Sequence, residues 1–366
     1  MHVLFSLWNS IQQYLIPHIE EHLGTLTEKE EEFVRVAELA AIDSHLGPFK
    51  WVGNGRKPAS RKAIALAFIA KAIWDFPTTA AMIEYLKTSR NLRRLCGWES
   101  TSNIPSEATF SRAFGQFSRE QLPGKLHETL VRKNLEGRIV GHNSRDSTKI
   151  EGREKAVKKP KKEVKKEAKP KKLRGRWRKG DYSEQWFTCL DLQVGRSMEA
   201  NLKELPAQCD IGAKRNSKGH YEAWKGFKLH IDVADGGIPI SAILTSASLH
   251  DSQAAIPLMQ MSSDRVAYLY DLADSAYDAP QIKGYSRLRG HVPIIAQNKR
   301  RGEAIPMEPA QAVRFRERSS AERVNSNLKD NYGGRFNRVR GAAKVMAHLM
   351  FGILALTANQ LFNLLE

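Results

Sequence analysis

Cysteine is scarce in this sequence, and no two cysteines have the spacing of a metal site. The three cysteines, Cys96, Cys189 and Cys209, are odd in number and widely separated. The absence of a CxxC or Cys/His pattern argues against a zinc site, and an odd, scattered set argues against a disulfide framework. We therefore expect a protein of a reducing, cytoplasmic compartment.

The sequence also lacks an evident secretory signal and an uninterrupted membrane-spanning segment. Acidic residues occur early, at Glu20 and Glu21, and no charged segment is followed there by a long apolar core. The strongest membrane candidate, Val345 to Leu365, is apolar over about the thickness of a bilayer but is interrupted by His348, Asn359, Gln360 and Asn363. We expect this segment to be a helix of the protein core.

Acidic residues are too few to balance the basic ones. The chain has 58 Lys and Arg against 40 Asp and Glu, a net charge of +18. Such an excess points to a polyanionic partner, first nucleic acid and second an anionic membrane surface. Much of it lies in a Lys-rich tract at about residues 153–180, which we expect to be a disordered insertion. The tract is either a solvated spacer or a sequence-independent contact to phosphates.

The order of helix and strand patterns divides the 366 residues into two predicted domains. Residues 1–135 read as short helices separated by Pro or polar turns, among them 63–74 and 106–117, and arginines between them favour a DNA-binding domain. Residues 136–366 contain a hairpin at 227–244 followed by alternating helices and strands, which predicts a mixed sheet flanked by helices. The predicted fold class is α/β, preceded by an all-α domain.

Three acids in the second domain have the placement that a metal-dependent phosphoryl-transfer site requires. Asp146 and Asp274 follow strand patterns, and Glu322 lies in a helical run. Carboxylate oxygens that converge from distant positions can hold two Mg²⁺ ions, which neutralise a phosphate and activate water. Each acid alone could also cap a turn or a helix, and Asp271 is a nearby rival for the second position.

The helical run around Glu322 carries two cations on the same predicted face. Arg318 lies four residues before Glu322, and Lys329 lies seven residues after it. Residues with these spacings share one side of an α-helix, so the pattern is compatible both with ion pairs to Glu322 and with contacts to a phosphate.

The Y-x2-R-x3-E-x6-K motif of DDE transposases from bacterial insertion sequences resembles the run formed by Phe315, Arg318, Glu322 and Lys329. The residues around Asp146 and those from Asp274 to Tyr277 are similar to the surroundings of the first two acids in that family. Residues 55–112 resemble the helical domain found ahead of such catalytic domains, so the likeness covers most of the chain from about residue 45. The chain departs from the pattern at Phe315, where the family usually has Tyr, and at Ser275-Ala276, where it has a basic residue and Gly.

The resemblance implies an RNase H-like catalytic fold in which Asp146, Asp274 and Glu322 bind two Mg²⁺ or Mn²⁺ ions. It implies an enzyme that nicks transposon ends and joins the freed 3′-OH to target DNA. It further implies DNA contacts by residues near the acids, namely Arg318, Lys329, Phe315 and Tyr277. The expected partner is double-stranded DNA, both terminal inverted repeats and target, bridged by a homodimer in the cytoplasm at the nucleoid.

Three alternatives differ from this prediction in what the protein does with its partner. A catalytically silent DNA-binding derivative would keep the fold and lose the cleavage. A plain metal-dependent nuclease would hydrolyse DNA without strand transfer, and the sequence does not separate the two because one site performs both reactions. Binding to a membrane surface through the Lys-rich tract and the C-terminal helix is the third.

Overall fold

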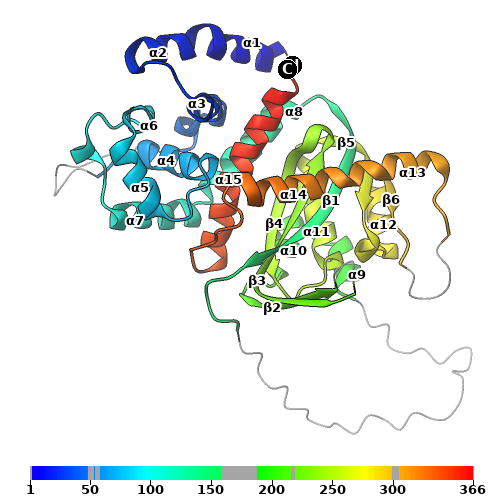
Figure 1. Ribbon diagram of the computed structural model, residues 1–366. Helices are drawn as coiled ribbons and strands as arrows, with labels where there is room; N and C mark the ends of the chain where they lie inside the picture. The colour runs from blue at the N-terminus through cyan, green and yellow to red at the C-terminus, as the bar shows by residue number, and fades with distance from the viewer. Residues whose placement is uncertain are drawn as a thin grey trace, which may run out of the picture.

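The computed structural model describes residues 2–47, 53, 58–157, 188–215, 219–298 and 305–365. Helices dominate up to residue 135, and a mixed sheet with flanking helices follows (Figure 1). The predicted Lys-rich insertion at about 153–180 falls almost entirely outside the described residues. The predicted boundary between 135 and 136 lies between the last helix of the first part and the first strand.

The first part consists of short helices whose starts are set by side-chain caps. In α3, Thr27 and Glu30 form a capping box, in which each side chain accepts a hydrogen bond from the other residue's backbone N–H. Thr78 caps α5 by accepting a bond from the Ala81 N–H. The helices are α1 (His2–Ser10), α2 (Ile16–Leu23), α3 (Glu28–Ala40), α4 (Arg61–Ile73), α5 (Thr79–Thr88), α6 (Arg90–Leu95), α7 (Glu107–Arg119) and α8 (Leu122–Leu135).

The sheet combines an antiparallel and a parallel half. Among the described residues its strands are β1 (Ile139–Glu151), β2 (Asp210–Arg215), β3 (Tyr221–Ala234), β4 (Ile238–Ser246), β5 (Ala267–Ala273) and β6 (Val292–Ile295). β3 pairs antiparallel with β1, β2 and β4, whereas β5 pairs parallel with both β1 and β6. The strand order is β2-β3-β1-β5-β6, with β4 also paired to β3, and it forms a mixed, RNase H-like sheet. The predicted fold class is confirmed.

Helices cover the sheet, and one of them joins it to the first part. α11 (Ser252–Arg265) packs on β3, β4 and β5, and α14 (Ser319–Asn331) packs across β1 and β3, in front of the strands in Figure 1. The remaining helices are α9 (Cys189–Val194), α10 (Met198–Glu204), α12 (Pro280–Leu288), α13 (Pro309–Phe315) and α15 (Ala342–Asn363).

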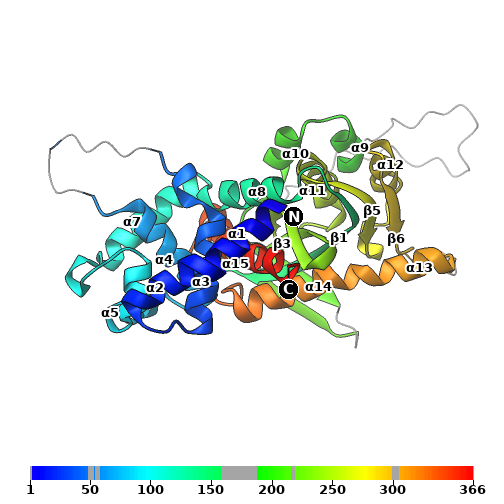
Figure 2. The same cartoon turned by 90° about the horizontal axis from the view of Figure 1, so that it is seen from above.

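The last helix, α15, lies between the N-terminal helices and the sheet (Figures 1 and 2). It contacts α3, α4, α7 and α8 on one side and β4 on the other, and its side chains belong to one continuous apolar core. By length and composition it could cross a membrane, but 78% of its most apolar window is buried inside the protein. The expectation that this segment is a core helix is confirmed.

Candidate active site

Two of the three predicted acids lie side by side at the centre of the sheet. β1 and β5 run parallel, and their register places Arg145 opposite Ala273. The next residue on each chain is Asp146 and Asp274, so the pairing delivers both carboxylates to the same level of the sheet. The Asp274 carboxylate is fixed by the Ala276 N–H, which donates to its Oδ1 at 2.9 Å.

The helix that carries Glu322 docks directly on the first acid. Asn325, one turn further along α14, donates from Nδ2 to Asp146 Oδ2 at 2.9 Å. Glu322 itself is more than half exposed and pairs with Arg318, whose guanidinium lies 2.7 Å from its Oε1. The structure thus brings α14 to the two aspartates while holding Glu322 in an ion pair.

The three acids share one electrostatic environment. The pKa of Asp146 is raised to about 6, chiefly by burial and also by the nearby Asp274 and Glu322 carboxylates, against the hydrogen bonds from Ser147 and Asn325 that lower it. Burial also raises the pKa of Asp274, with Asp251 and Glu322 adding to the shift and Arg318 opposing it. Like charges gathered in a poorly solvated place favour a bound cation.

A fourth acid, Asp251, stands beside this group. Its Oδ1 accepts a hydrogen bond from Lys228 Nζ at 2.8 Å, and Ser147, next to Asp146, also donates to it. Asp251 is not among the site residues predicted from the sequence. An Asp immediately before a helix reads as a cap, and only the fold shows that α11 begins beside the end of β5.

The remaining predicted site residues divide into accessible and inaccessible ones. Lys329 donates to Thr148 Oγ1 at 2.5 Å, two residues along β1 from Asp146. Phe315 lies under Arg318, with the guanidinium carbon 5.6 Å from the ring centre. Tyr277 is only 1% exposed. The predicted DNA contact by Tyr277 is therefore not available in this structure, because its ring packs inside the apolar cluster around α11 and α12.

The rival second acid, Asp271, occupies a different environment. It is fully buried, and Arg145 approaches its Oδ1 at 3.4 Å and Asp232 Oδ2 at 2.8 Å. This buried ion cluster lies away from Asn325 and α14, whereas Asp274 is electrostatically coupled to Glu322. Asp274 remains our choice for the second position.

The carboxylates at this place are of the kind that binds a hard divalent cation, but in this structure they do not form a complete metal site. Within the described ranges, no group of three or more His, Cys, Asp or Glu side chains is positioned to hold a metal ion. The carboxylates of Asp146 and Asp274 provide the oxygen ligands that Mg²⁺ prefers, and Asp146 has no cation paired with it in that part of the chain. Glu322 would join them by leaving Arg318.

Comparisons with known proteins identify the family of the chain. Residues 200–358 match the family model of the transposase DDE domain, and residues 18–116 match that of a transposase domain, DUF772. The first match contains Asp274 and Glu322, whereas Asp146 lies before it and is connected to the site by the pairing of β1 with β5. No curated protein and no solved structure matches the chain. The two matched segments together span more than half of the chain, which belongs to the DDE-type insertion-sequence transposases.

Proposed function

We propose that this DNA transposase nicks transposon ends and joins the freed 3′-OH to target DNA, using Asp146, Asp274 and Glu322 to hold two Mg²⁺ or Mn²⁺ ions. The observation that carries the proposal is the convergence of Asp146 and Asp274 on neighbouring parallel strands, under the helix that bears Glu322. Two bound ions would neutralise the phosphate oxygens and activate the attacking water or 3′-OH.

The chain's own residues supply orientation and charge. Asn325 and the Ala276 N–H each hold one oxygen of an aspartate, and both carboxylates keep lone pairs that can bind a cation. Arg318 neutralises Glu322 in the free protein, and we assign it to a DNA phosphate once Glu322 turns to a metal ion. Lys329 binds a second phosphate beside Thr148, and the Phe315 ring packs against the Arg318 guanidinium.

The proposal also covers the DNA substrates, the oligomeric state and the cellular location of the protein. The substrates are double-stranded DNA carrying the terminal inverted repeats and a target duplex. A homodimer bridges the two ends, and the protein acts in the cytoplasm at the nucleoid. The net charge of +18 supports association with a polyanion of this kind.

The test compares wild type with Glu322→Gln on DNA that carries the flanking inverted repeats. The change is nearly isosteric, keeps the helix and removes one metal-binding charge. We expect wild type to cut at the repeat ends with Mg²⁺, and Glu322→Gln to bind equally well without cutting. Cutting by both proteins would remove Glu322 from the site. Joined products separate a transposase from a plain nuclease, which releases cut ends only.

A second candidate is a catalytically silent DNA-binding derivative, and one contact favours it. The Arg318–Glu322 ion pair, at 2.7 Å, withdraws the third carboxylate from the aspartates. If wild type and Glu322→Gln both bind DNA and neither cuts with Mg²⁺ or Mn²⁺, this function replaces the first.

A further inference from the structure

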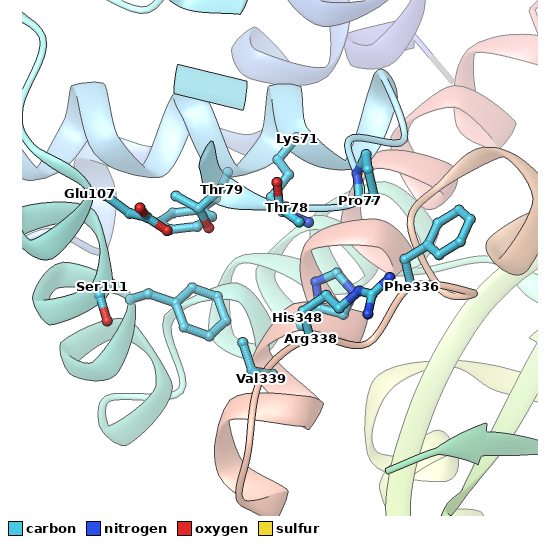
Figure 3. Close-up of a pocket in the computed structure, with 12 residues that line it drawn as sticks. Lys71, Pro77, Thr78, Thr79, Glu107, Ser111, Phe336, Arg338, Val339 and His348 are labelled. Atoms are coloured by element: carbon cyan, nitrogen blue, oxygen red, sulfur yellow. The ribbon is translucent and has the colours of Figure 1, made fainter. Parts of the chain in front are cut away.

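A groove with basic walls opens where α7 meets the segment between α14 and α15. Its volume is about 340 Å³, and its lining includes Phe114, Val339, Arg153, Arg338, Arg340 and Lys344. We call it the α7 groove. It adjoins a smaller cavity of about 130 Å³, shown in Figure 3, in which Glu107 and Ser111 come from α7 while Arg338 and Val339 come from the opposite segment.

Hydrogen bonds fasten the backbone around the α7 groove, and its cations are not neutralised by the described acids. Arg153 donates from Nη1 to the Arg338 carbonyl oxygen at 3.1 Å, and Asn337 donates to the Glu151 carbonyl oxygen at 3.0 Å. These bonds fasten the segment before α15 to the end of β1. Glu154, the nearest acid in sequence, accepts a bond from the Gly341 N–H at 3.1 Å. None of the four groove cations forms an ion pair with another described residue.

β1 connects this groove to the acids. The strand runs from Asp146 past Thr148, where Lys329 binds, and the chain reaches Arg153 two residues after the strand ends. The strand portion from Asp146 to Glu151 alone spans about 17 Å at about 3.3 Å per residue. Cations therefore recur along one path from the acids to the groove.

The first part of this path is already crowded with positive charge. Burial lowers the pKa of Lys329, and the neighbouring Lys149, Lys214 and Arg335 lower it further. Two of these neighbours have acidic partners, Lys149 with Glu222 and Arg335 with Asp330. Lys329 binds a neutral hydroxyl instead, so an added anion would relieve repulsion at this point.

We propose that the sugar-phosphate backbone of duplex DNA follows this path, from the acids over Lys329 to the α7 groove. We call the path the β1 track; it consists of Lys329, Arg153, Arg338, Arg340 and Lys344. The inference rests on the proposed function, because it takes the acids as the place where DNA is cut. A duplex presents a phosphate every 3.4 Å along each strand, so cations that recur over this length fit one continuous strand.

The groove end of the track is tested with Arg340→Gln plus Lys344→Gln, because both residues are exposed and neither touches the acids. A matched control removes two exposed cations outside the track, Lys133 on α8 and Arg287 on α12, in the same way. Binding of a labelled 30-bp duplex is measured by anisotropy over a range of salt concentrations without Mg²⁺. The groove variant should bind at least about tenfold more weakly at 0.15 M salt, and its slope of log K against log[salt] should fall by about 2. Thermal melting should match wild type.

Three results would overturn the track. Equal weakening in the groove and control variants would show diffuse attraction by net charge, and unchanged binding in the groove variant would exclude contact there. Binding of a poly-glutamate peptide that competes with DNA and is lost in the groove variant at least as strongly would assign the groove to an acidic protein partner. Because the assay needs no cleavage, its outcome stands apart from the Glu322→Gln test. A groove-dependent duplex affinity without cutting would place the track in a DNA-binding derivative.

Discussion

Arg145 and Asp146 are neighbours on β1, and their side chains point to opposite faces of the sheet. The charge of Arg145 is paired within the protein, whereas that of Asp146 is not paired among the described residues. Arg145 turns toward Asp232 and Asp271, at 2.8 and 3.4 Å, and Ser262 of α11 donates to Asp232 at 2.7 Å. Asp146 turns toward α14, where Asn325 is its side-chain donor and other acids are its charged neighbours. The alternation extends to both neighbours of Asp146 on its face, because Ser144 and Thr148 also bond to the α14 side.

The difference separates a charge cluster that stabilises the fold from one that awaits a partner. On the Arg145 face, one guanidinium serves two carboxylates, and burial raises the pKa of Asp271, so a single proton brings the cluster close to neutrality. On the Asp146 face no cation among the described residues forms an ion pair with the buried aspartate, and the nearby Lys329 donates to Thr148 instead. Unbalanced buried charge costs stability, and sites that bind charged ligands commonly retain it for that reason.

The largest effect is expected on the Arg145 face. Arg145→Met removes the guanidinium and leaves Asp232 buried beside Asp271 without a cation. We expect the free energy of unfolding to fall by about 3–5 kcal/mol, as for other broken buried ion pairs. Urea unfolding followed by circular dichroism measures it.

The matched control for that variant is Arg318→Met, which breaks the exposed pair with Glu322. Its cost should be within about 1 kcal/mol, because solvent screens a half-exposed ion pair. Similar losses in both variants would mean that the buried cluster contributes no more than a surface pair, and the contrast between the two faces would fail.

An intermediate effect of opposite sign is expected on the Asp146 face. Asp146→Asn keeps the shape of the side chain and removes a carboxyl group whose pKa is raised to about 6. Because the folded state binds that proton more tightly than the unfolded state, wild type loses stability as pH rises from about 4 to 6. At pH 7.5 without divalent metal the Asn variant should therefore be more stable by about 1–3 kcal/mol, and the gain should vanish below about pH 4.

The same variant separates a ligand site from a merely strained one. Mg²⁺ should raise the melting temperature of wild type and leave that of Asp146→Asn nearly unchanged, since ligands stabilise only the state that binds them. DNA cleavage should be lost in the variant. A destabilised Asn variant at pH 7.5 would show that the aspartate is satisfied within the fold, and the comparison would have to be redrawn.

The contrast between the two faces of β1 shows which features of the fold and the site could be predicted from the sequence. The hairpin around Asp235 and the alternating pattern after it predict the sheet, because strand periodicity and turn residues are local signals. The choice of Asp274 over Asp271 depends on the resemblance to the family around Tyr277 and stays a prediction, and in the fold Asp271 pairs with Arg145. Asp271 lies within β5 and Asp274 directly follows it, so the strand pattern alone does not show which distant groups each of them meets.

Other features depend on distances that no local pattern contains. The sequence places Arg318, Glu322 and Lys329 on one face, yet only Arg318 pairs with Glu322, and Lys329 reaches Thr148 instead. A 3₁₀ turn, Arg316–Arg318, precedes α14 and lies beside β1. Asp251 enters the site because α11 begins near β5, which the hairpin and helix patterns do not specify.

The smallest change in stability is expected from Tyr277→Phe. This variant tests whether the Tyr277 hydroxyl acts together with the acids on the Asp146 face. The Tyr277 ring is 1% exposed, and its hydroxyl has no hydrogen-bond partner among the described residues. Burial raises its pKa well above the usual range, and Asp251, Asp146 and Asp274 raise it further, so it stays a neutral phenol. Removing an unpaired buried hydroxyl costs little, and we expect stability within about 1 kcal/mol of wild type or slightly above it.

DNA affinity should not change in Tyr277→Phe, because a ring at 1% exposure contacts protein and not solvent. Tyr277→Ala is the packing control and should cost about 3–5 kcal/mol through the cavity that it leaves. Anisotropy with a labelled duplex and urea unfolding read out both variants. A tenfold loss of cleavage in Tyr277→Phe at unchanged affinity would mean that the hydroxyl donates to an aspartate during the reaction. The face of β1 that carries Asp146 would then include a hydroxyl that donates a hydrogen bond to the acids only during the reaction.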